Sequence, residues 1–229
     1  MISPLDNPQP ISVRSIPMKH TFLSLLALAV LGAGTAVVAG DGWGSIFDGK
    51  TLNGWKSNDE VPGCFTVENG ALKVSGGRAH IFYVGPDGYA KFKNFECKAK
   101  VMTMAGANSG IYIHTEFQGK GWPSKGYECQ VNTSHKDVKK TGGLYAIKDV
   151  LNDAPCKDNE WFDYYIKVEG KHIILKINGK VTTDFTEPDN WEPPKGMPGR
   201  RLSEGTFALQ GHDPKSTTYY KGIFVNPLP

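Results

Sequence analysis

Short segments in which apolar and polar residues alternate recur along this chain, and three of them share an unusual polar side. Residues 108–114 read Asn-Ser-Gly-Ile-Tyr-Ile-His, residues 126–132 read Gly-Tyr-Glu-Cys-Gln-Val-Asn, and residues 207–212 read Phe-Ala-Leu-Gln-Gly-His. Because successive side chains on a β-strand point to opposite faces, each segment is predicted to be a strand with one buried and one polar face. The residues predicted to be buried are Ile111, Ile113, Tyr127, Cys129, Val131, Phe207 and Leu209.

The polar sides of these three segments carry groups that can bind a ligand. They are Tyr112, His114, Glu128, Gln130, Asn132, Gln210 and His212. A solvated sheet face usually carries Lys, Ser and Thr, whereas this mixture of aromatic, amide, imidazole and carboxyl groups is typical of a cleft that binds a hydroxyl-rich molecule. We therefore predict that the three segments line one cleft for such a molecule. The alternative is a solvated face with an unusual composition.

The rest of the chain predicts further strands and turns but no helix. Phe95–Val101 places its apolar residues at odd positions, and the pairs Asn69-Gly70 and Asn178-Gly179 each separate two alternating runs, as in two-residue β-hairpins. Glu187–Glu204 holds four prolines and two glycines, which predicts a loop. No βαβ spacing and no phosphate-binding loop is found. The pattern indicates one all-β domain over residues 40–229, a sandwich or a barrel.

Residues 1–39 are predicted to be a leader rather than part of the fold. A short basic stretch precedes an apolar core at about residues 21–38, and small residues end at Ala39. These features predict a secretory signal peptide, and hence export to the periplasm or the extracellular space. An uncleaved membrane anchor is the alternative, although Gly32-Ala-Gly-Thr35 makes the apolar run weak for a span. After cleavage no membrane span is expected. Met18 is a second candidate for the start of translation.

The charge and the cysteines narrow the function further. The formal net charge of +3 is spread along 229 residues, so neither nucleic acid nor an anionic membrane is an expected partner. Cys97 and Cys129 fall on the apolar side of predicted strands and are expected to be buried thiols. Cys64 and Cys156 lie in turn-rich stretches where a disulfide bond is conceivable after export. The sequence does not fix the pairing.

Seven short motifs occur in one order along the chain and resemble the 3-keto-disaccharide hydrolase domain family. They are Ile46-Phe-Asp-Gly-Lys-Thr-Leu-Asn-Gly-Trp55, Asn108-Ser-Gly-Ile-Tyr112, Gly126-Tyr-Glu128 with Gln130, Thr141-Gly-Gly-Leu-Tyr145, Glu160-Trp161, Ile177-Asn-Gly179 and Leu209-Gln-Gly-His212. The resemblance implies a concanavalin-like jelly-roll β-sandwich of two antiparallel sheets with a concave ligand face. It also implies an enzyme that cleaves sugars oxidised at C3. At His114 the chain departs from the family, where an arginine is more common.

A ketone at C3 acidifies the hydrogen at C2, so a base, a donor for the enolate oxygen and an acid for the leaving group suffice for an elimination. Direct hydrolysis needs two carboxylates, and the predicted polar face carries only Glu128. We assign the base to Glu128 or His212, the acid to Tyr145 and enolate stabilisation to Lys148. Residues predicted to hold the substrate are Tyr112, His114, Gln130, Asn132 and Gln210, with Trp122 and His135 at the edge of the cleft.

Several alternatives stay open at this point. No cofactor and no metal is assigned, but His114, Glu128 and His212 form a conceivable ligand set for a divalent transition metal. A lectin-like carbohydrate-binding module and an envelope interaction protein are the competing functions. His80 and His172 are expected on the surfaces of strands, and Trp55 and Trp161 in the core. The oligomeric state is not predicted.

Overall fold

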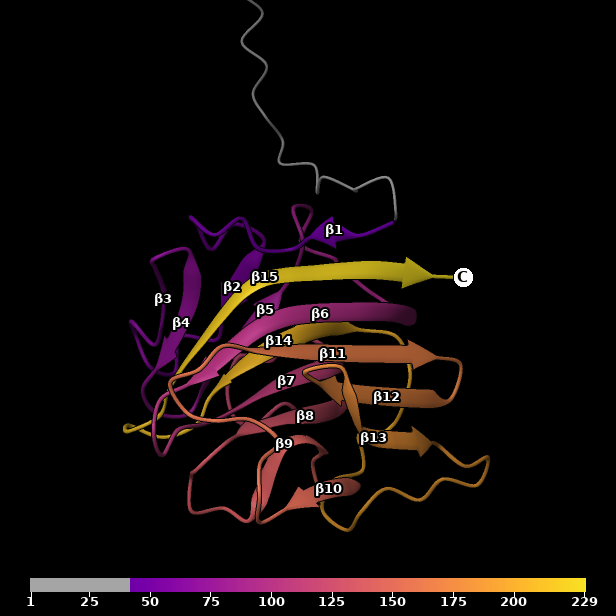
Figure 1. The fold of residues 1–229 in the computed structure, drawn as a ribbon. Coiled ribbons are helices and arrows are strands. Elements are labelled where there is room, and N and C mark those ends of the chain that lie inside the picture. Colours follow the sequence, from indigo (N-terminus) through magenta and orange to yellow (C-terminus); the bar gives the residue numbers. More distant parts are fainter. Residues whose placement is uncertain (1–41) are drawn as a thin grey trace, which may run out of the picture. The chain divides into compact units, whose positions relative to one another are not determined.

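The computed structural model describes residues 42–229, which form fifteen strands in two antiparallel sheets (Figure 1). The prediction of an all-β sandwich is confirmed. Within this part of the chain, no helix has the length and apolar character needed to span a bilayer. The leader predicted for residues 1–39 lies outside the described residues and stays a prediction.

One sheet has eight strands, in the order β13-β12-β11-β6-β15-β4-β3, and β1 pairs with β15 beside this path. The strands are β1 (Gly44–Ser45), β3 (Phe65–Glu68), β4 (Ala71–Ser75), β6 (Asn94–Thr103), β11 (Phe162–Glu169), β12 (His172–Ile177), β13 (Lys180–Thr186) and β15 (Thr217–Leu228). The other sheet has seven strands, in the order β10-β9-β8-β7-β14-β5-β2. They are β2 (Trp55–Ser57), β5 (Ala79–Tyr83), β7 (Asn108–Thr115), β8 (Tyr127–Asn132), β9 (Lys139–Leu144), β10 (Lys148–Leu151) and β14 (Thr206–Gly211).

Both predicted Asn-Gly hairpins are present. Asn69 and Gly70 join β3 to β4 with φ angles of 51° and 77°, and Asn178 and Gly179 join β12 to β13 with φ angles of 49° and 78°. Two successive residues with positive φ define the tight turn whose twist matches that of the flanking strands. These two hairpins fix the register of the outer strands of the eight-stranded sheet.

The hydrophobic core lies between the sheets, and the alternation predicted its composition on the central strands. All seven residues predicted to be buried from β7, β8 and β14 belong to it, as do the apolar residues at odd positions of β6. Trp55 is also buried and donates its indole N–H to the Ile46 carbonyl oxygen at 2.7 Å. Trp161, in contrast, is 37% exposed, with the Lys221 ammonium 3.9 Å from its ring centre, so its predicted core position is wrong.

All four cysteines lie among the described residues, and all four are free thiols. Cys97 and Cys129 are buried in the core, as predicted. Cys64 lies near the Gly77 carbonyl and Cys156 near the Thr133 hydroxyl, so the conceivable Cys64–Cys156 disulfide is not formed. Burial raises the pKa of Cys64 to about 11, which makes this thiol unreactive.

Candidate functional site

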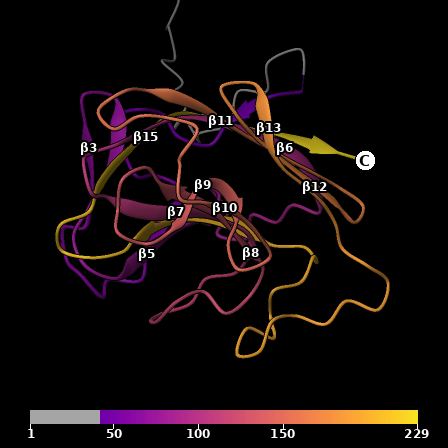
Figure 2. The same ribbon diagram turned by 60° about the horizontal axis from the view of Figure 1, so that its bottom comes forward.

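A cavity of about 390 Å³ opens on the face of the seven-stranded sheet that is turned away from the eight-stranded sheet. Its volume lies in the range of small-molecule binding sites. Figure 2 shows that two long loops, residues 116–126 and 187–205, extend on this side of the sheet. Residues of the strands and of these loops and turns line the cavity, among them Tyr112, Trp122, Glu128, Gln130, Tyr145, Arg200, Gln210 and His212.

Strand register explains why the polar groups meet. Tyr112 on β7 lies directly opposite Glu128 on β8, and Gly110 lies opposite Gln130. Directly opposed residues of an antiparallel pair project from the same face of the sheet. On the other side of β7, Ala208 of β14 pairs with Tyr112, so Gln210, two residues further along β14, projects from that face as well. The structure thus brings Glu128, Gln130 and Gln210 together in one cavity, which His212, directly after β14, also lines.

Glu128 is the most completely bonded acidic group of the cavity. Its Oε2 accepts hydrogen bonds from the Tyr112 hydroxyl at 2.9 Å and from the Arg200 guanidinium at 3.5 Å. Its Oε1 accepts one from the Gln210 amide nitrogen at 2.9 Å. Gly110 provides the space, because a Cβ at this position would lie 2.7 Å from Oε1. The carboxylate is thus held in one orientation at the floor of the cavity.

Burial dominates the acid–base character of Glu128. Loss of solvation raises the pKa of this carboxyl above its ordinary value, although Arg200, Tyr112 and Gln210 oppose the shift. Burial beside Glu128 likewise raises the pKa of the Tyr112 hydroxyl, which therefore stays protonated and donates. A carboxyl with a raised pKa is closer to the range in which a base both accepts and releases a proton near neutral pH.

The raised pKa predicts a pH dependence of stability. The folded state binds the Glu128 proton more tightly than the unfolded state, so the stability due to this group is present below about pH 4.3 and is lost as pH rises through the folded-state pKa. The free energy of unfolding of the native protein, measured in urea relative to that of Glu128→Gln, should fall over that interval. A difference that grows with pH would show that the folded state lowers this pKa instead.

Arg200 is a site residue that the sequence analysis missed. It lies in the loop predicted from its prolines, yet its side chain is only 7% exposed. One guanidinium nitrogen donates to the Gly126 carbonyl oxygen at 3.1 Å, and the group lies 5.3 Å from the centre of the Tyr112 ring. The Nε atom has no hydrogen-bond acceptor among residues 42–229. Arg200 therefore balances the charge of Glu128 in the cavity wall, with its Nε buried and unbonded.

His114 does not lie where the alternation placed it. Its φ angle is 53°, and the pairing of β7 with β14 shifts between Tyr112 and Thr115, which is a β-bulge. The bulge turns the imidazole toward β6 of the other sheet, where it packs edge-on against Phe95. Its Nε2 contacts the Lys93 carbonyl oxygen at 2.9 Å. The substrate contact predicted for His114 is therefore not supported, and a metal set of His114, Glu128 and His212 is excluded.

Two other predicted site residues also lie outside the cavity. Asn132 is buried, and its amide nitrogen donates to the carbonyl oxygens of Asp137 and Lys139, so it stabilises the turn after β8. Lys148 is exposed on β10 at the edge of the sheet. Tyr145, three residues earlier, does line the cavity, and burial raises the pKa of its hydroxyl.

Aromatic and imidazole rings form one edge of the cavity. Trp122, 43% exposed, lies 5.4 Å from the His212 ring and 5.5 Å from the His80 ring. His80 is completely buried, which contradicts its predicted surface position, and burial lowers its pKa to about 3. His172, as predicted, lies at the surface, where it pairs with Asp184. Trp122 is therefore partly exposed beside the cavity, with the Arg78 guanidinium 5.9 Å from its ring centre.

The sequence model of the 3-keto-alpha-glucoside-1,2-lyase-like domain matches residues 42–226, which is nearly all of the described chain. The chain belongs to this family. A protein from Bacteroides thetaiotaomicron named 3-keto-disaccharide hydrolase is 42% identical over 81 residues, a stretch that covers 33% of this chain. The same stretch spans only 28% of the length of that relative.

Solved structures agree on the fold. A crystal structure from Parabacteroides distasonis, named as a proposed glycosyl hydrolase, superimposes with a TM-score of 0.70 at 23% identity, covering 82% of this chain and 95% of that chain. The carbohydrate-binding module CBM66 from Bacillus subtilis gives a TM-score of 0.53 at 13% identity, covering 76% of this chain and 96% of that chain. These likenesses confirm the concanavalin-like sandwich that the family resemblance implied.

Proposed function

We propose that this family member is an enzyme that cleaves glycosides whose sugar ring carries a ketone at C3, and that it does so by elimination. The observation that carries the proposal is the pair of Glu128 and Arg200 in one cavity, 3.5 Å apart. A base beside a fixed cationic donor is what removal of a proton next to a ketone requires. The signal peptide predicted from residues 1–39 supports a reaction outside the cytoplasm.

The reaction proceeds through an enolate. Glu128 takes the proton from C2, and the electron pair of the C–H bond moves toward the C3 ketone, whose oxygen becomes the enolate oxygen. Arg200 donates hydrogen bonds to that oxygen. When the enolate collapses, C1 and C2 form a double bond, the C1–O bond breaks, and the leaving oxygen takes a proton. Water then adds across the double bond and yields the free 3-keto sugar.

The cavity provides the remaining roles. Tyr145 is the proton donor to the leaving oxygen, since its raised pKa keeps the hydroxyl protonated. Gln130 and the rim residue Trp122 hold the sugar, through its hydroxyls and its ring face respectively. Tyr112 and Gln210 keep the Glu128 carboxylate in place. In this set the cationic donor is Arg200 from the loop after β13, and His114 has no role.

Tyr145→Phe should lower kcat by about 10²-fold for a 3-keto-disaccharide, because general acids contribute on the order of 10²–10⁴. The matched control is Lys148→Ala, which should change kcat by no more than about twofold, since surface substitutions shift free energies by about 0.5 kcal/mol or less. Steady-state kinetics of both variants measure this. A large loss of kcat in Lys148→Ala, together with a normal kcat in Tyr145→Phe, would show that Lys148 and not Tyr145 acts in the reaction.

The proposed activity is tested by incubating the purified chain with a 3-keto-disaccharide and with its unoxidised parent. We expect sugar release from the 3-keto compound alone. Binding of both compounds without turnover would replace the enzyme with a lectin-like module. If neither compound binds, the cavity has another ligand and the chain uses the scaffold for a different interaction.

A further inference from the structure

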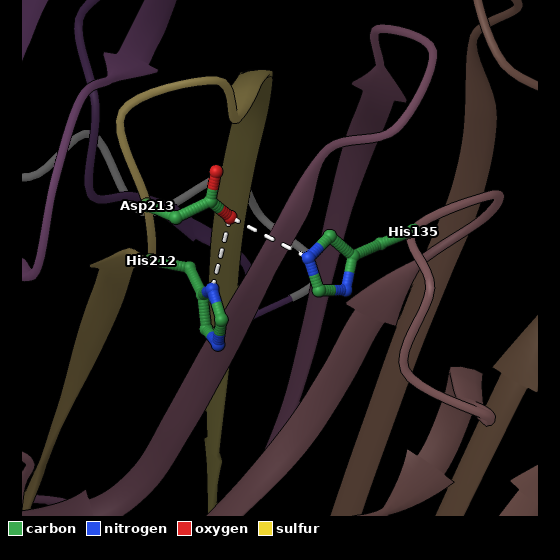
Figure 3. Close-up of side chains that lie close together, drawn as sticks. All are labelled: His135, His212 and Asp213. Carbon is green, nitrogen blue, oxygen red and sulfur yellow. Dashed lines mark hydrogen bonds and ion pairs between the residues drawn. The ribbon is translucent and has the colours of Figure 1, made fainter.

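Two histidines and an aspartate come together at the edge of the cavity, on loops that are far apart in the sequence. His135 lies in the loop after β8, and His212 and Asp213 directly follow β14. Figure 3 shows both imidazoles directed at the same carboxylate oxygen of Asp213. The His212 Nδ1 lies 3.0 Å from Asp213 Oδ2, and the His135 Nε2 lies 3.7 Å from it. All three candidate ligand atoms lie within 4.8 Å of one another.

We propose that His135, His212 and Asp213 form a binding site for one divalent transition-metal ion. Metal–nitrogen distances of about 2.1 Å place neighbouring ligand atoms about 3.0 to 3.4 Å apart, depending on the coordination geometry. The spacing of His212 and Asp213, 3.0 Å, lies at the lower end of that range, and the spacing of His135 and Asp213, 3.7 Å, lies just above it. The longer one exceeds the usual hydrogen-bond distance of about 3.2 Å at most. His135 and Asp213 are thus not directly hydrogen-bonded, and an approach of a few tenths of an ångström would bring them to the spacing of two ligands of one ion.

Neighbouring groups hold the aspartate as a metal-binding carboxylate is usually held. Oδ2 accepts a hydrogen bond from the Ser216 hydroxyl at 2.6 Å, and Oδ1 accepts one from the Lys215 backbone N–H at 3.0 Å. The Ser216 hydroxyl in turn accepts the Asn108 backbone N–H at 2.8 Å. Such outer contacts orient the ligands of metal sites and contribute to affinity.

Two contacts have to change on binding. The ion replaces the hydrogen bond between His212 Nδ1 and Asp213 Oδ2, so that His212 carries its proton on Nε2. The second contact is made by His135. The backbone N–H of Asp137 donates to His135 Nδ1 at 3.1 Å, which places the ring proton on Nε2 when no metal is bound. A metal on Nε2 requires the proton on Nδ1 instead. The side-chain amide of Asn108, 3.3 Å away, supplies the acceptor once it turns its oxygen to the ring. Metal binding therefore reorganises residues 135–137, and the affinity is lower than that of a site already arranged for its ion.

The ligand types select the ion. Two imidazole nitrogens and one carboxylate oxygen favour Mn²⁺, Fe²⁺, Co²⁺ or Zn²⁺ over Ca²⁺ and Mg²⁺, which prefer oxygen ligands alone. Three protein ligands leave coordination positions open. Because His212 lines the cavity, an open position lies beside the place where a ligand enters. Oxygen atoms of a bound molecule are the natural occupants of such positions.

The test is metal binding by the full chain after treatment with a chelator. Titration calorimetry with Mn²⁺ and Co²⁺, and the visible spectrum of the Co²⁺ form, should show one equivalent bound through nitrogen and oxygen ligands. His135→Ala and Asp213→Asn should each weaken binding at least about tenfold. His172→Ala is the matched control, because His172 is a surface histidine of the other sheet, and it should bind like the native protein.

Circular dichroism checks that each variant is folded. Absence of stoichiometric binding by the native protein, or equal binding by native protein, His135→Ala and Asp213→Asn, would overturn the proposal. Metal binding is measured without substrate, so this experiment can refute the metal site without refuting the proposed activity, and the converse also holds.

Discussion

Glu128→Gln is expected to lower kcat for a 3-keto-disaccharide by about 10²–10⁴-fold, the usual contribution of a positioned base. The amide has nearly the shape of the carboxyl group, and its one oxygen still accepts a hydrogen bond from Tyr112 or from Gln210, which donate to different oxygens of Glu128. It cannot take a proton from carbon. KM should change much less than kcat, because the sugar contacts assigned to Gln130 and Trp122 remain. Steady-state kinetics with the 3-keto-disaccharide measure both constants.

The control for this variant is Glu169→Gln. Glu169 is an exposed carboxylate of β11, in the sheet that does not form the cavity, and it pairs with Lys167. Its replacement should leave kcat unchanged. If Glu128→Gln turns over as fast as the native protein while it binds substrate normally, Glu128 is not the base, and His212 becomes the remaining candidate on the cavity wall.

Arg200→Lys is expected to lower kcat/KM by about 10²–10³-fold, the effect of removing one donor that stabilises a developing oxyanion. Lysine keeps the positive charge beside Glu128 but loses the planar group that reaches the Gly126 carbonyl and Glu128 together. The lost buried hydrogen bond should also lower the free energy of unfolding by about 1–3 kcal/mol. Kinetics and urea denaturation measure the two effects.

Arg201→Lys is the matched control, because the neighbouring residue in the chain is exposed. It should keep both the activity and the stability of the native protein. If Arg200→Lys loses stability but keeps kcat/KM, Arg200 only balances the buried charge of Glu128, and the enolate oxygen must find its donor elsewhere in the cavity.

Alternation along β7, β8 and β14 predicted the core and most of the cavity floor, because these strands pair in register and each has one face against the other sheet. Period-two alternation is a local property of a strand, so it can be read from sequence wherever the strand is regular. That is why Glu128, Gln130 and Gln210 were found together. The same property explains why the predicted position of His114 is wrong. A β-bulge inserts one extra residue there, so the His114 side chain points to the opposite face of the sheet from the one that alternation predicts.

Contacts made by loops could not be predicted in this way. Arg200 lies in an irregular loop, and its burial depends on Gly126 and Glu128, which are more than 70 residues away in the chain. No local pattern encodes such a contact. The same holds for His80, whose neighbours on the buried face are Tyr112 and the loop residue Trp122.

The central claim, that the cavity removes a proton from C2 of a 3-keto sugar, is tested most directly with a 3-keto-disaccharide that carries deuterium at C2. The account predicts that deuterium is lost to solvent as the released 3-keto sugar forms, and that turnover of the deuterated compound is slower whenever proton removal limits the rate. Mass spectrometry of the product measures the loss. Release of a sugar that retains its C2 deuterium would contradict the elimination and leave direct hydrolysis in its place.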